Sequence, residues 1–200
     1  MKIFAFTDLH GDSEALRKIE EKIKKHKPEL IVCAGDLSIF GDHFTYLVAE
    51  LDSFGLPVLL IPGNHEQDSL IRHAGTMFDN VKDIHKKTYL VNDCLFIGYG
   101  SGGFSLVDED FEKLTGKFKQ DIKKLKPKKI VLVTHAPPYN TKVDNIHGNP
   151  AGNKSIRNFI QDIKPDLVIC GHLHENEGKT DTIGRTKIIN PGFEGKIIVV

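Results

Sequence analysis

Long apolar stretches are missing from this chain of 200 residues. No segment approaches the roughly 20 apolar residues that a membrane-spanning helix needs. The first strand-like run meets an acidic residue at Asp8, which is too early for the apolar core of a signal peptide. We therefore expect a cytoplasmic protein without a membrane partner.

Cysteine and net charge are also scarce. The chain has three cysteines, an odd and sparse set that is not typical of a disulfide framework. We expect Cys33, Cys94 and Cys170 to be buried as apolar residues. The 27 basic residues balance the 27 acidic ones, so the chain as a whole has no general attraction to nucleic acid or to an anionic membrane. A local basic patch is still compatible with this balance.

The remaining composition is that of an ordinary globular protein. Hydrophobic residues make up 40% and charged residues 27% of the chain, which are usual proportions for a soluble domain. A length of 200 residues fits one domain, and we find no linker, repeat array or low-complexity segment. We expect a single domain that spans residues 1–200.

Five short apolar runs, rich in β-branched residues, predict buried parallel strands. They occupy residues 3–7, 30–34, 58–62, 130–134 and 167–170. Amphipathic segments between the runs predict helices over residues 13–26, 44–54, 108–125 and 154–163. Two hairpins are predicted over 87–98 and 177–189, followed by a last strand over 196–200. The βαβ units indicate the α/β class.

Each of the five apolar runs ends in a short polar cluster. In open α/β sheets, ligands bind outside the carboxyl ends of the strands, so we expect these clusters to meet at one edge. They supply seven candidate metal ligands: Asp8, His10, Asp36, Asn64, His135, His172 and His174. Hard and borderline metal ions take this mixture of oxygen and imidazole ligands. Seven ligands are too many for one ion and suit two.

Two ions would give this set a definite chemistry. At a separation of about 3.5–4 Å they would share the Asp36 carboxylate and a hydroxide, and they would lower the pKa of that water toward roughly 7. The hydroxide would attack phosphorus in line with the leaving oxygen. His65 is a candidate to protonate the leaving group, because an imidazole titrates near neutral pH. Glu66 is a candidate to orient His65 by accepting its second ring proton.

The polar clusters also resemble those of a known family. The series Asp8-x-His10, Gly35-Asp36, Gly63-Asn64-His65-Glu66, His135 and Gly171-His172-x-His174 is similar to the calcineurin-like metallophosphoesterase superfamily. The resemblance implies a four-layer αββα sandwich, in which two mixed β-sheets are flanked by helices. This fold is classed as α/β, or as α+β by some schemes.

The same resemblance implies a ligand set for each metal. The first metal would be held by Asp8, His10, Asp36 and His174. The second would be held by Asp36, Asn64, His135 and His172. His65 would be the acid near the leaving group. Apart from the resemblance, Asn64 and His65 are also candidate substrate-binding residues. We expect two divalent ions, with manganese preferred, although iron, zinc and nickel tolerate the same ligands.

Two departures from the family pattern narrow the expected branch. No arginine follows Asp36, which argues against the phosphoprotein phosphatases, and the chain has no large insertion that could cap the site. The sequence is similar to small, uncapped members of prokaryotic type. We expect hydrolysis of a small-molecule or nucleotide phosphoester, either a monoester or a diester; the sequence assigns no oligomeric state.

The long loop over residues 136–153 is a second candidate region. It precedes a predicted helix that carries Lys154 and Arg157, and a Gly-rich turn at a helix N-terminus can bind anions. A phosphate contact and an ordinary capped loop are both open here. Within this loop, His147 is a candidate substrate-binding residue. His43, His73 and His85 match no cluster, and we expect them on the surface.

Two alternatives to a phosphohydrolase of small substrates follow from the same residues. A nuclease would need a basic groove across the sheet edge at which the candidate metal ligands meet. The balanced net charge of the chain does not indicate such a groove. A metal-binding scaffold with little catalytic activity would typically have lost a ligand or the His of the Asn-His pair. Here Asn64 and His65 are both present, which favours an enzyme.

Overall fold

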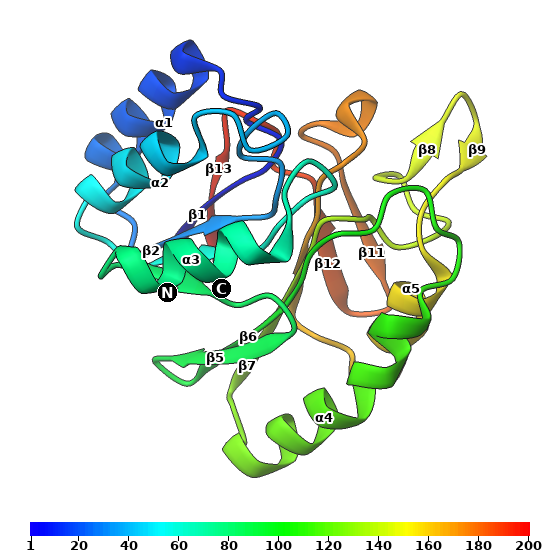
Figure 1. Cartoon of the computed structure of the whole chain (residues 1–200). Helices are drawn as coiled ribbons and strands as arrows, with labels where there is room; N and C mark the ends of the chain where they lie inside the picture. Colours follow the sequence, from blue (N-terminus) through cyan, green and yellow to red (C-terminus); the bar gives the residue numbers. More distant parts are fainter.

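The computed structural model describes all 200 residues and places two β-sheets face to face (Figure 1). The first sheet has five strands in the order β13–β1–β2–β3–β4. In that order they span Lys196–Val199, Lys2–Phe6, Leu30–Cys33, Val58–Leu60 and Val81–Asp83. The second sheet has six strands in the order β11–β12–β10–β7–β6–β5. These span Thr180–Ile183, Thr186–Ile189, Leu167–Ile169, Lys129–Thr134, Cys94–Tyr99 and Lys87–Val91.

Helices cover the outer face of each sheet (Figure 1). The first sheet is covered by α1 (Ser13–His26), α2 (Phe44–Ser53) and α3 (Asp68–Met77). The second is covered by α4 (Glu109–Leu125) and α5 (Lys154–Ile163). A small hairpin of β8 (Asn145–Ile146) and β9 (Asn149–Pro150) projects from the second half, and a short 3₁₀ helix, η1, spans His174–Asn176.

Strand alternation explains the four layers. Successive side chains of a strand point to opposite faces. In β1, Phe4 and Phe6 pack against the helices, whereas Ile3 and Ala5 pack between the two sheets. Every one of these residues is fully buried. The expected αββα sandwich of two mixed sheets is therefore confirmed.

The helices form for local reasons that the sequence already contains. In α1, Leu16, Ile19 and Ile23 recur at helical spacing and are buried. The Asp12 carboxylate caps the helix by accepting the backbone N–H of Glu14 at 2.9 Å. The observed bounds of α1 and α5 equal the predicted ones, and α2 ends one residue earlier than predicted.

Several elements and one burial state differ from expectation: α3, β4, the β8–β9 hairpin and η1 were not predicted. Helix α3 was not predicted because it buries only Ile71 and Ala74, which is too thin a stripe to give a clear helical period. Strand β4 has only three residues. His85 lies just beyond β4 and is buried, so its expected place on the surface was wrong. The three cysteines are buried and free, as predicted.

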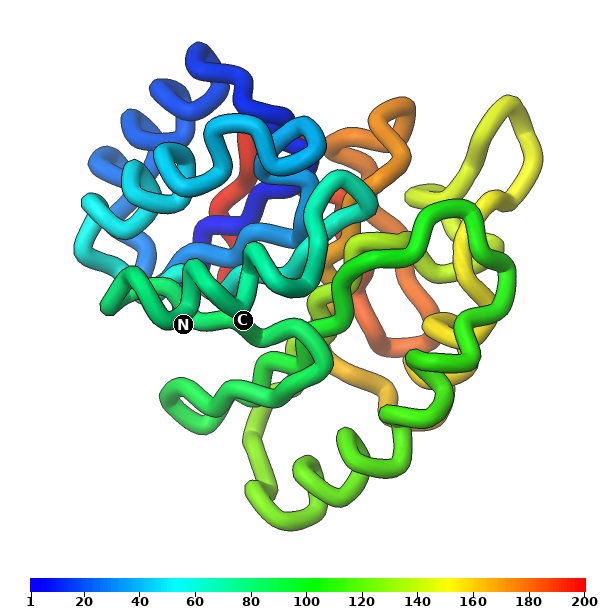
Figure 2. The backbone as a smooth tube through the Cα atoms, in the orientation of Figure 1, coloured from blue at the N-terminus to red at the C-terminus, as the bar shows by residue number.

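The topology brings the carboxyl ends of many strands to one edge. Strands β1, β2, β3 and β4 run parallel to one another, and so do β6, β7, β10 and β12. The backbone trace in Figure 2 shows the loops that follow these strands gathered between the two halves of the molecule. None of the helices is long and apolar enough to cross a membrane.

Candidate metal centre

The loops that follow five strands bring the seven predicted ligands together. The first sheet supplies four of them, from the loops after β1, β2 and β3, and the second sheet supplies three, from the loops after β7 and β10. Contacts between side chains link the two halves: Asn64 from the first sheet meets His135 and His172 from the second. The predicted convergence of these residues is present in the structure.

The backbone at this edge adopts conformations that side chains rarely take. Asp8, His10, Asp36 and His172 have φ angles of 55°, 50°, 51° and 69°, which lie in the left-handed region. Such conformations are uncommon outside glycine and cluster at functional sites, where the surrounding structure holds them. They turn the chain sharply at the end of a strand, and four of the seven candidate ligands lie on these turns.

Glycines allow the strand ends to approach one another. A Cβ atom at Gly63 would overlap the Asp36 carboxylate, and one at Gly171 would overlap the Thr7 hydroxyl and crowd the Asp8 carboxylate. Glycine is therefore required beside both acids because any side chain would occupy the space that the carboxylates fill.

The first group of candidate ligands consists of Asp8, His10, Asp36 and His174. The Nε2 atoms of His10 and His174 lie 3.1 Å apart. His174 Nε2 lies 3.6 Å from an Asp8 oxygen, and His10 Nε2 lies 3.9 Å from an Asp36 oxygen. Two neutral imidazole lone pairs this close repel each other unless a proton or a cation lies between them. The geometry therefore fits a cation bound among these four side chains.

The second group contains Asp36 again, with Asn64, His135 and His172. Asn64 Oδ1 lies 3.0 Å from His135 Nε2 and 2.8 Å from His172 Nδ1, and Asp36 Oδ2 lies 3.4 Å from His135 Nε2. His135 Nδ1 donates to the Ala34 carbonyl at 2.9 Å, so the Nε2 atom of a neutral ring carries a lone pair. That lone pair faces two oxygen acceptors, which also fits a cation.

Three ring nitrogens in and beside these groups are buried without a hydrogen-bond partner in the protein: His10 Nδ1, His65 Nδ1 and His172 Nε2. Buried polar atoms normally have a partner, and exceptions mark strain, function or a bound group. Their concentration at this edge indicates a site that holds further groups.

The charges of the site depend on the same contacts. Burial opposes ionisation of Asp36, but the hydrogen bond and charge of His135 hold the pKa of this carboxyl below its usual range. Burial would lower the pKa of His135, yet the Asp36 carboxylate raises it to about 8. Burial and the charge of His135 lower the pKa of His172 to about 4. At neutral pH the metal-free site thus presents an ionised carboxylate, a largely protonated His135 and a neutral His172. A metal ion bound to His135 would displace the proton from its Nε2 atom.

His65 lies beside the two groups. Its backbone N–H donates to Asp36 Oδ1 at 2.9 Å, and its Nε2 atom lies 4.0 Å from Asp36 Oδ2. The ring contacts that of His10 edge to face, with centroids 4.9 Å apart. About a quarter of the His65 side chain is exposed, so the ring reaches both the cluster and the surface.

Glu66 does not orient His65, and that expectation was wrong. Its carboxylate is buried below the site and accepts backbone N–H groups of Asp36, Ser38 and Gly63 at 3.0, 2.8 and 2.9 Å. Burial, as the largest effect, raises the pKa of Glu66. Although Glu66 follows His65 in sequence, its side chain points in another direction. It holds in place the loops that carry Asp36 and Asn64 and does not contact the His65 ring through a hydrogen bond.

The loop over residues 136–153 is ordered around a buried acid. The Asp144 carboxylate accepts the N–H groups of Asn140, Thr141 and Gly152. Asn153 caps α5 by accepting the N–H of Ile156 at 3.0 Å, so the N-terminus of this helix is an ordinary capped end. His147 lies exposed in the turn of the β8–β9 hairpin and makes no hydrogen bond or ring contact with the cluster.

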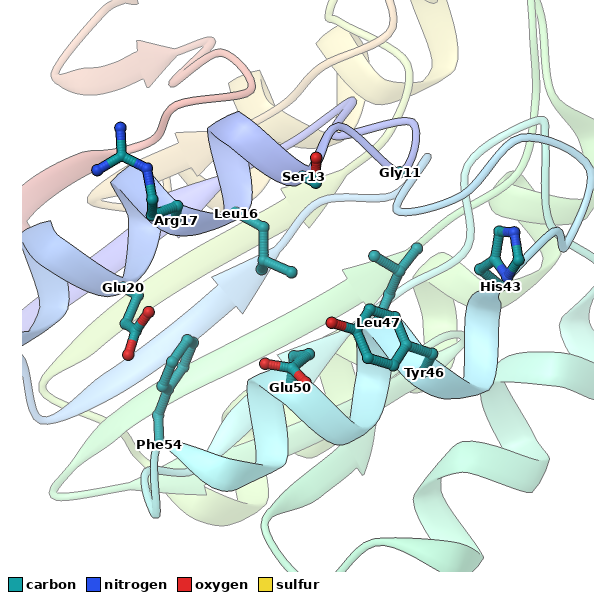
Figure 3. A pocket seen from close by; sticks show the side chains of 10 residues that line it. All are labelled: Gly11, Ser13, Leu16, Arg17, Glu20, His43, Tyr46, Leu47, Glu50 and Phe54. Carbon is teal, nitrogen blue, oxygen red and sulfur yellow. The ribbon is translucent and has the colours of Figure 1, made fainter.

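A groove of about 440 Å³ lies elsewhere, between α1 and α2. Figure 3 shows Leu16, Leu47, Tyr46 and Glu50 facing the space between these helices. Gly11, at one end of the groove, directly follows His10 in sequence, but none of the seven ligands lines the groove. The chemistry-bearing residues are therefore at the strand ends and not in this groove.

A four-layer αββα sandwich with an Asp, Asn and His cluster at its strand ends defines the class of metal-dependent phosphoester hydrolases. The family model of the calcineurin-like phosphoesterases matches residues 1–176. The chain belongs to this family, whose members are hydrolases that act on phosphoester bonds. The clustered candidate ligands are consistent with the metal dependence of the family.

Three relatives illustrate the similarity. An uncharacterised protein of Methanocaldococcus jannaschii is 35% identical, over 96% of this chain and 88% of its own. A crystal structure of a Thermus thermophilus protein has a TM-score of 0.76 at 18% identity, covering 96% of this chain and 88% of that one. A dimetal phosphatase from Danio rerio has a TM-score of 0.66 at 12% identity, covering 94% and 86%. The two structures support the fold.

Proposed function

We propose that this protein is a dinuclear metal-dependent phosphohydrolase in which Asp36 is shared by two divalent cations. The position of the Asp36 carboxylate carries the proposal. Its Oδ2 atom lies 3.9 Å from His10 Nε2 in one ligand group and 3.4 Å from His135 Nε2 in the other. A carboxylate between two histidine groups is the arrangement that a bridging ligand requires. The Danio rerio structural neighbour is described as a dimetal phosphatase, which agrees with this proposal.

The contacts of Asp36 with the two groups of histidines support a ligand set for each cation. Asp8, His10, Asp36 and His174 would hold the first cation, and Asp36, Asn64, His135 and His172 the second. When bound, the cations would activate a water and neutralise charge on the phosphoryl oxygens. Manganese is the expected metal, and iron, zinc and nickel are also compatible with these ligands. The ionised state of Asp8 and Asp36 supports binding of cations here.

His65 is proposed to donate a proton to the leaving oxygen. Its Nδ1 atom is buried without a protein partner, and its ring lies at the surface end of the cluster, next to Asp36. A positioned imidazole contributes about 10²–10⁴-fold to a rate through general acid catalysis. Asn64 and His65 would therefore lie at the phosphoryl group, and His147 stays a candidate for a more distant substrate contact.

The surroundings of the ligands favour a small substrate. None of the hydrogen bonds and ion pairs of the seven ligands involves lysine or arginine. A nuclease relies on several basic contacts to the phosphate backbone, so the site supports a small-molecule or nucleotide phosphoester better than a polynucleotide. Both a phosphodiester and a phosphomonoester are compatible with it.

The experiment measures metal content and turnover together. Protein freed of metal by a chelator is reloaded with manganese, iron, zinc or nickel and assayed with an aryl phosphodiester and an aryl phosphomonoester. We expect two ions per chain by elemental analysis, and turnover that requires them. Absence of turnover with every metal would refute the proposal, and so would full activity with a single ion per chain.

Variants assign the roles. Asp36→Asn should lower the content of both metals, because it removes the shared charge. His65→Ala should leave metal content unchanged and lower kcat by about 10²–10⁴-fold. His73→Ala is the matched control, since His73 is exposed on α3 and belongs to neither ligand group. A metal-binding scaffold would be indicated if His65→Ala left hydrolysis unchanged while Asp36→Asn abolished binding of a partner.

A further inference from the structure

Two phenylalanine rings stand exposed at the metal centre. Phe40 is 80% exposed and Phe104 is 68% exposed. The Phe40 ring lies against the His65 ring, with centroids 4.5 Å apart and planes inclined by 34°. The Phe104 ring lies against the His172 ring at 4.7 Å. Each ring therefore contacts a site histidine and leaves most of its surface exposed.

Phe40 is held in this exposed position at a cost. Its φ angle is 50°, a left-handed conformation that is an outlier for a bulky residue. An aromatic ring in solvent also forgoes the stabilisation that burial would give. Neither feature helps the fold, because the ring makes no contribution to any of the three core clusters.

The turn that carries Phe40 is tied to the metal centre. Gly41 N–H donates to Ser38 Oγ at 3.2 Å, and Ser38 N–H donates to Glu66 at 2.8 Å. The same Glu66 carboxylate accepts the N–H of Asp36 at 3.0 Å. The Phe40 ring is thus placed relative to Asp36 through two consecutive sets of hydrogen bonds.

The segment that carries Phe104 comes from the other sheet and is anchored on both sides of the ring. Ser101 N–H donates to the Pro62 carbonyl at 3.0 Å. Beyond the ring, Asn153 Nδ2 donates to the Ser105 carbonyl at 2.8 Å, and Lys154 N–H donates to the Leu106 carbonyl at 2.8 Å. The two sheets therefore each supply one exposed ring to the same site.

Other exposed apolar side chains gather on these two segments. Ten large hydrophobic side chains are exposed in the whole chain, and five of them lie within residues 39–40 and 104–107. Exposed apolar surface concentrated around a polar cluster indicates a binding site. The cluster can hold the phosphoryl group, and the apolar rim is suited to the organic part of the substrate.

We propose that Phe40 and Phe104 are substrate-binding residues that recognise a planar aromatic group, and that the physiological substrate is a small phosphoester bearing a nucleobase. Bases and aryl groups stack on phenylalanine, and such stacking does not depend on a hydrogen-bonding pattern. A sugar phosphate offers no planar face to these rings. A polynucleotide would need basic contacts that the ligands of the site lack.

Because this assignment rests on the proposed function, the test uses binding and not turnover. Manganese-loaded protein is titrated calorimetrically with adenosine 5′-phosphate and with ribose 5-phosphate, and both ligands are checked for hydrolysis afterwards. These ligands share the phosphate and the ribose, so their affinity ratio reports the base alone. We expect the base to improve affinity about tenfold, a usual effect of one stacked base.

Variants identify the rings responsible. Phe40→Leu and Phe104→Leu should each reduce the preference for the base several-fold while leaving the affinity for ribose 5-phosphate unchanged. Phe40→Tyr keeps the ring and should keep the preference. Tyr46→Leu is the matched control, because Tyr46 is also an exposed aromatic residue, at 59%, but lies on α2 facing the groove away from the ligands.

Three results would overturn the assignment. One is equal affinity for the two ligands. Another is an equal loss for both ligands in the leucine variants, which would show that the rings only position His65 and His172. The third is a change confined to the sedimentation coefficient of the variants, which would make the rim an interface between two copies. A ring-dependent base preference without any hydrolysis would support the assignment and refute only the proposed function.

Discussion

The carboxylate of Glu66 accepts the backbone N–H of Asp36 at 3.0 Å, from below the strand ends. The same oxygen accepts the N–H of Gly63 at 2.9 Å, and the other oxygen accepts the N–H and the hydroxyl of Ser38. Glu66 therefore joins the loop after β2 to the loop after β3. The position of Asp36, the proposed shared ligand, depends on a residue that makes no hydrogen bond to His135, His172 or His174.

Glu66→Gln should weaken both the fold and the metal centre. The amide keeps the size of the carboxylate but replaces one acceptor with an NH₂ group, which would face N–H donors. Leaving a buried donor unpaired costs about 1–3 kcal/mol, and loss of a group that orients metal ligands costs about 10–100-fold in metal affinity. Urea unfolding of metal-free protein and competition with a metal indicator measure the two effects.

The exposed Glu109, in the first turn of α4, provides the matched control. Glu109→Gln removes the same charge without touching a buried N–H group, so it should change metal affinity little. An unchanged metal affinity in Glu66→Gln would show that the loops hold Asp36 without this carboxylate.

Metal removal should lower the melting temperature. Cations that bind only the folded chain at about 100 times their dissociation constant add about 2.7 kcal/mol of stability. For a domain of this size that corresponds to about 5–10 °C. Differential scanning fluorimetry with manganese and with chelator measures the shift. Asp36→Asn should abolish most of it, while Asp162→Asn, which alters a surface ion pair with Lys119, should retain it.

Two glycine-to-alanine changes should have opposite signs. A Cβ atom at Gly171 would overlap Thr7 and crowd Asp8, and such overpacking costs typically about 1–3 kcal/mol. Gly116 lies inside α4 with open space around the added atom, so Gly116→Ala should stabilise the protein by about 0.4–1 kcal/mol. Chemical denaturation of the metal-free proteins compares them. Equal effects would contradict the close approach of β10 to β1.

His85 should make stability depend on pH below neutrality. Burial lowers the pKa of His85, with a smaller lowering effect of Lys86, against the raising effects of Asp68 and Asp83. In the unfolded chain, His85 therefore binds a proton near the ordinary pKa of histidine, about 6.5. In the folded chain it binds this proton only at lower pH. The stabilising contribution is complete above about pH 6.5 and is lost as the pH falls through the lower folded pKa.

The free energy of unfolding at about pH 7.5 and at about pH 5.5, measured with chelator, tests this expectation. The difference between the two values should be smaller in His85→Gln than in the wild type, because the variant has no proton to bind at this position. A difference of the same size in both proteins would refute it. The candidate metal ligands titrate in both proteins. Their contribution therefore cancels when the pH-dependent difference in the free energy of unfolding of the variant is subtracted from that of the wild type.

Local patterns were sufficient for most of the fold. The helix over residues 13–26 was predictable because Asp12 supplies a cap and Leu16, Ile19 and Ile23 supply one apolar face. The hairpin over 87–98 was predictable from two β-like runs around Asn92 and Asp93. Among the elements that escaped prediction, α3 buries only two apolar residues, and β4, β8, β9 and η1 have two or three residues each. Helix α3 and strand β4 have only a short sequence pattern, because they are stabilised by residues that are close in space but distant in sequence.

The candidate site divides in the same way. The strand ends indicated the seven candidate ligands, since parallel strands deliver their carboxyl ends to one edge. The role of Glu66 and the burial of His85 were not predictable, because each depends on which way one side chain points. The exposure of Phe40 and Phe104 was not predictable from the sequence, because the residue type alone does not show whether an apolar side chain in a loop is buried or faces solvent.

The sequence by itself therefore determined which types of side chain follow the strands, the order of the strands along the chain and the family to which the chain belongs. Only the tertiary structure decided that Asp36 lies between two groups of histidines, that Asn64 meets His135 across the two sheets, and that Glu66 lies beneath them. The physical reason is the separation in sequence of the residues that interact. A helix or strand is favoured by residues within a few positions of one another, whereas these contacts join residues about 30 to 100 positions apart. Their distances are fixed only when the strands pair and one sheet packs on the other.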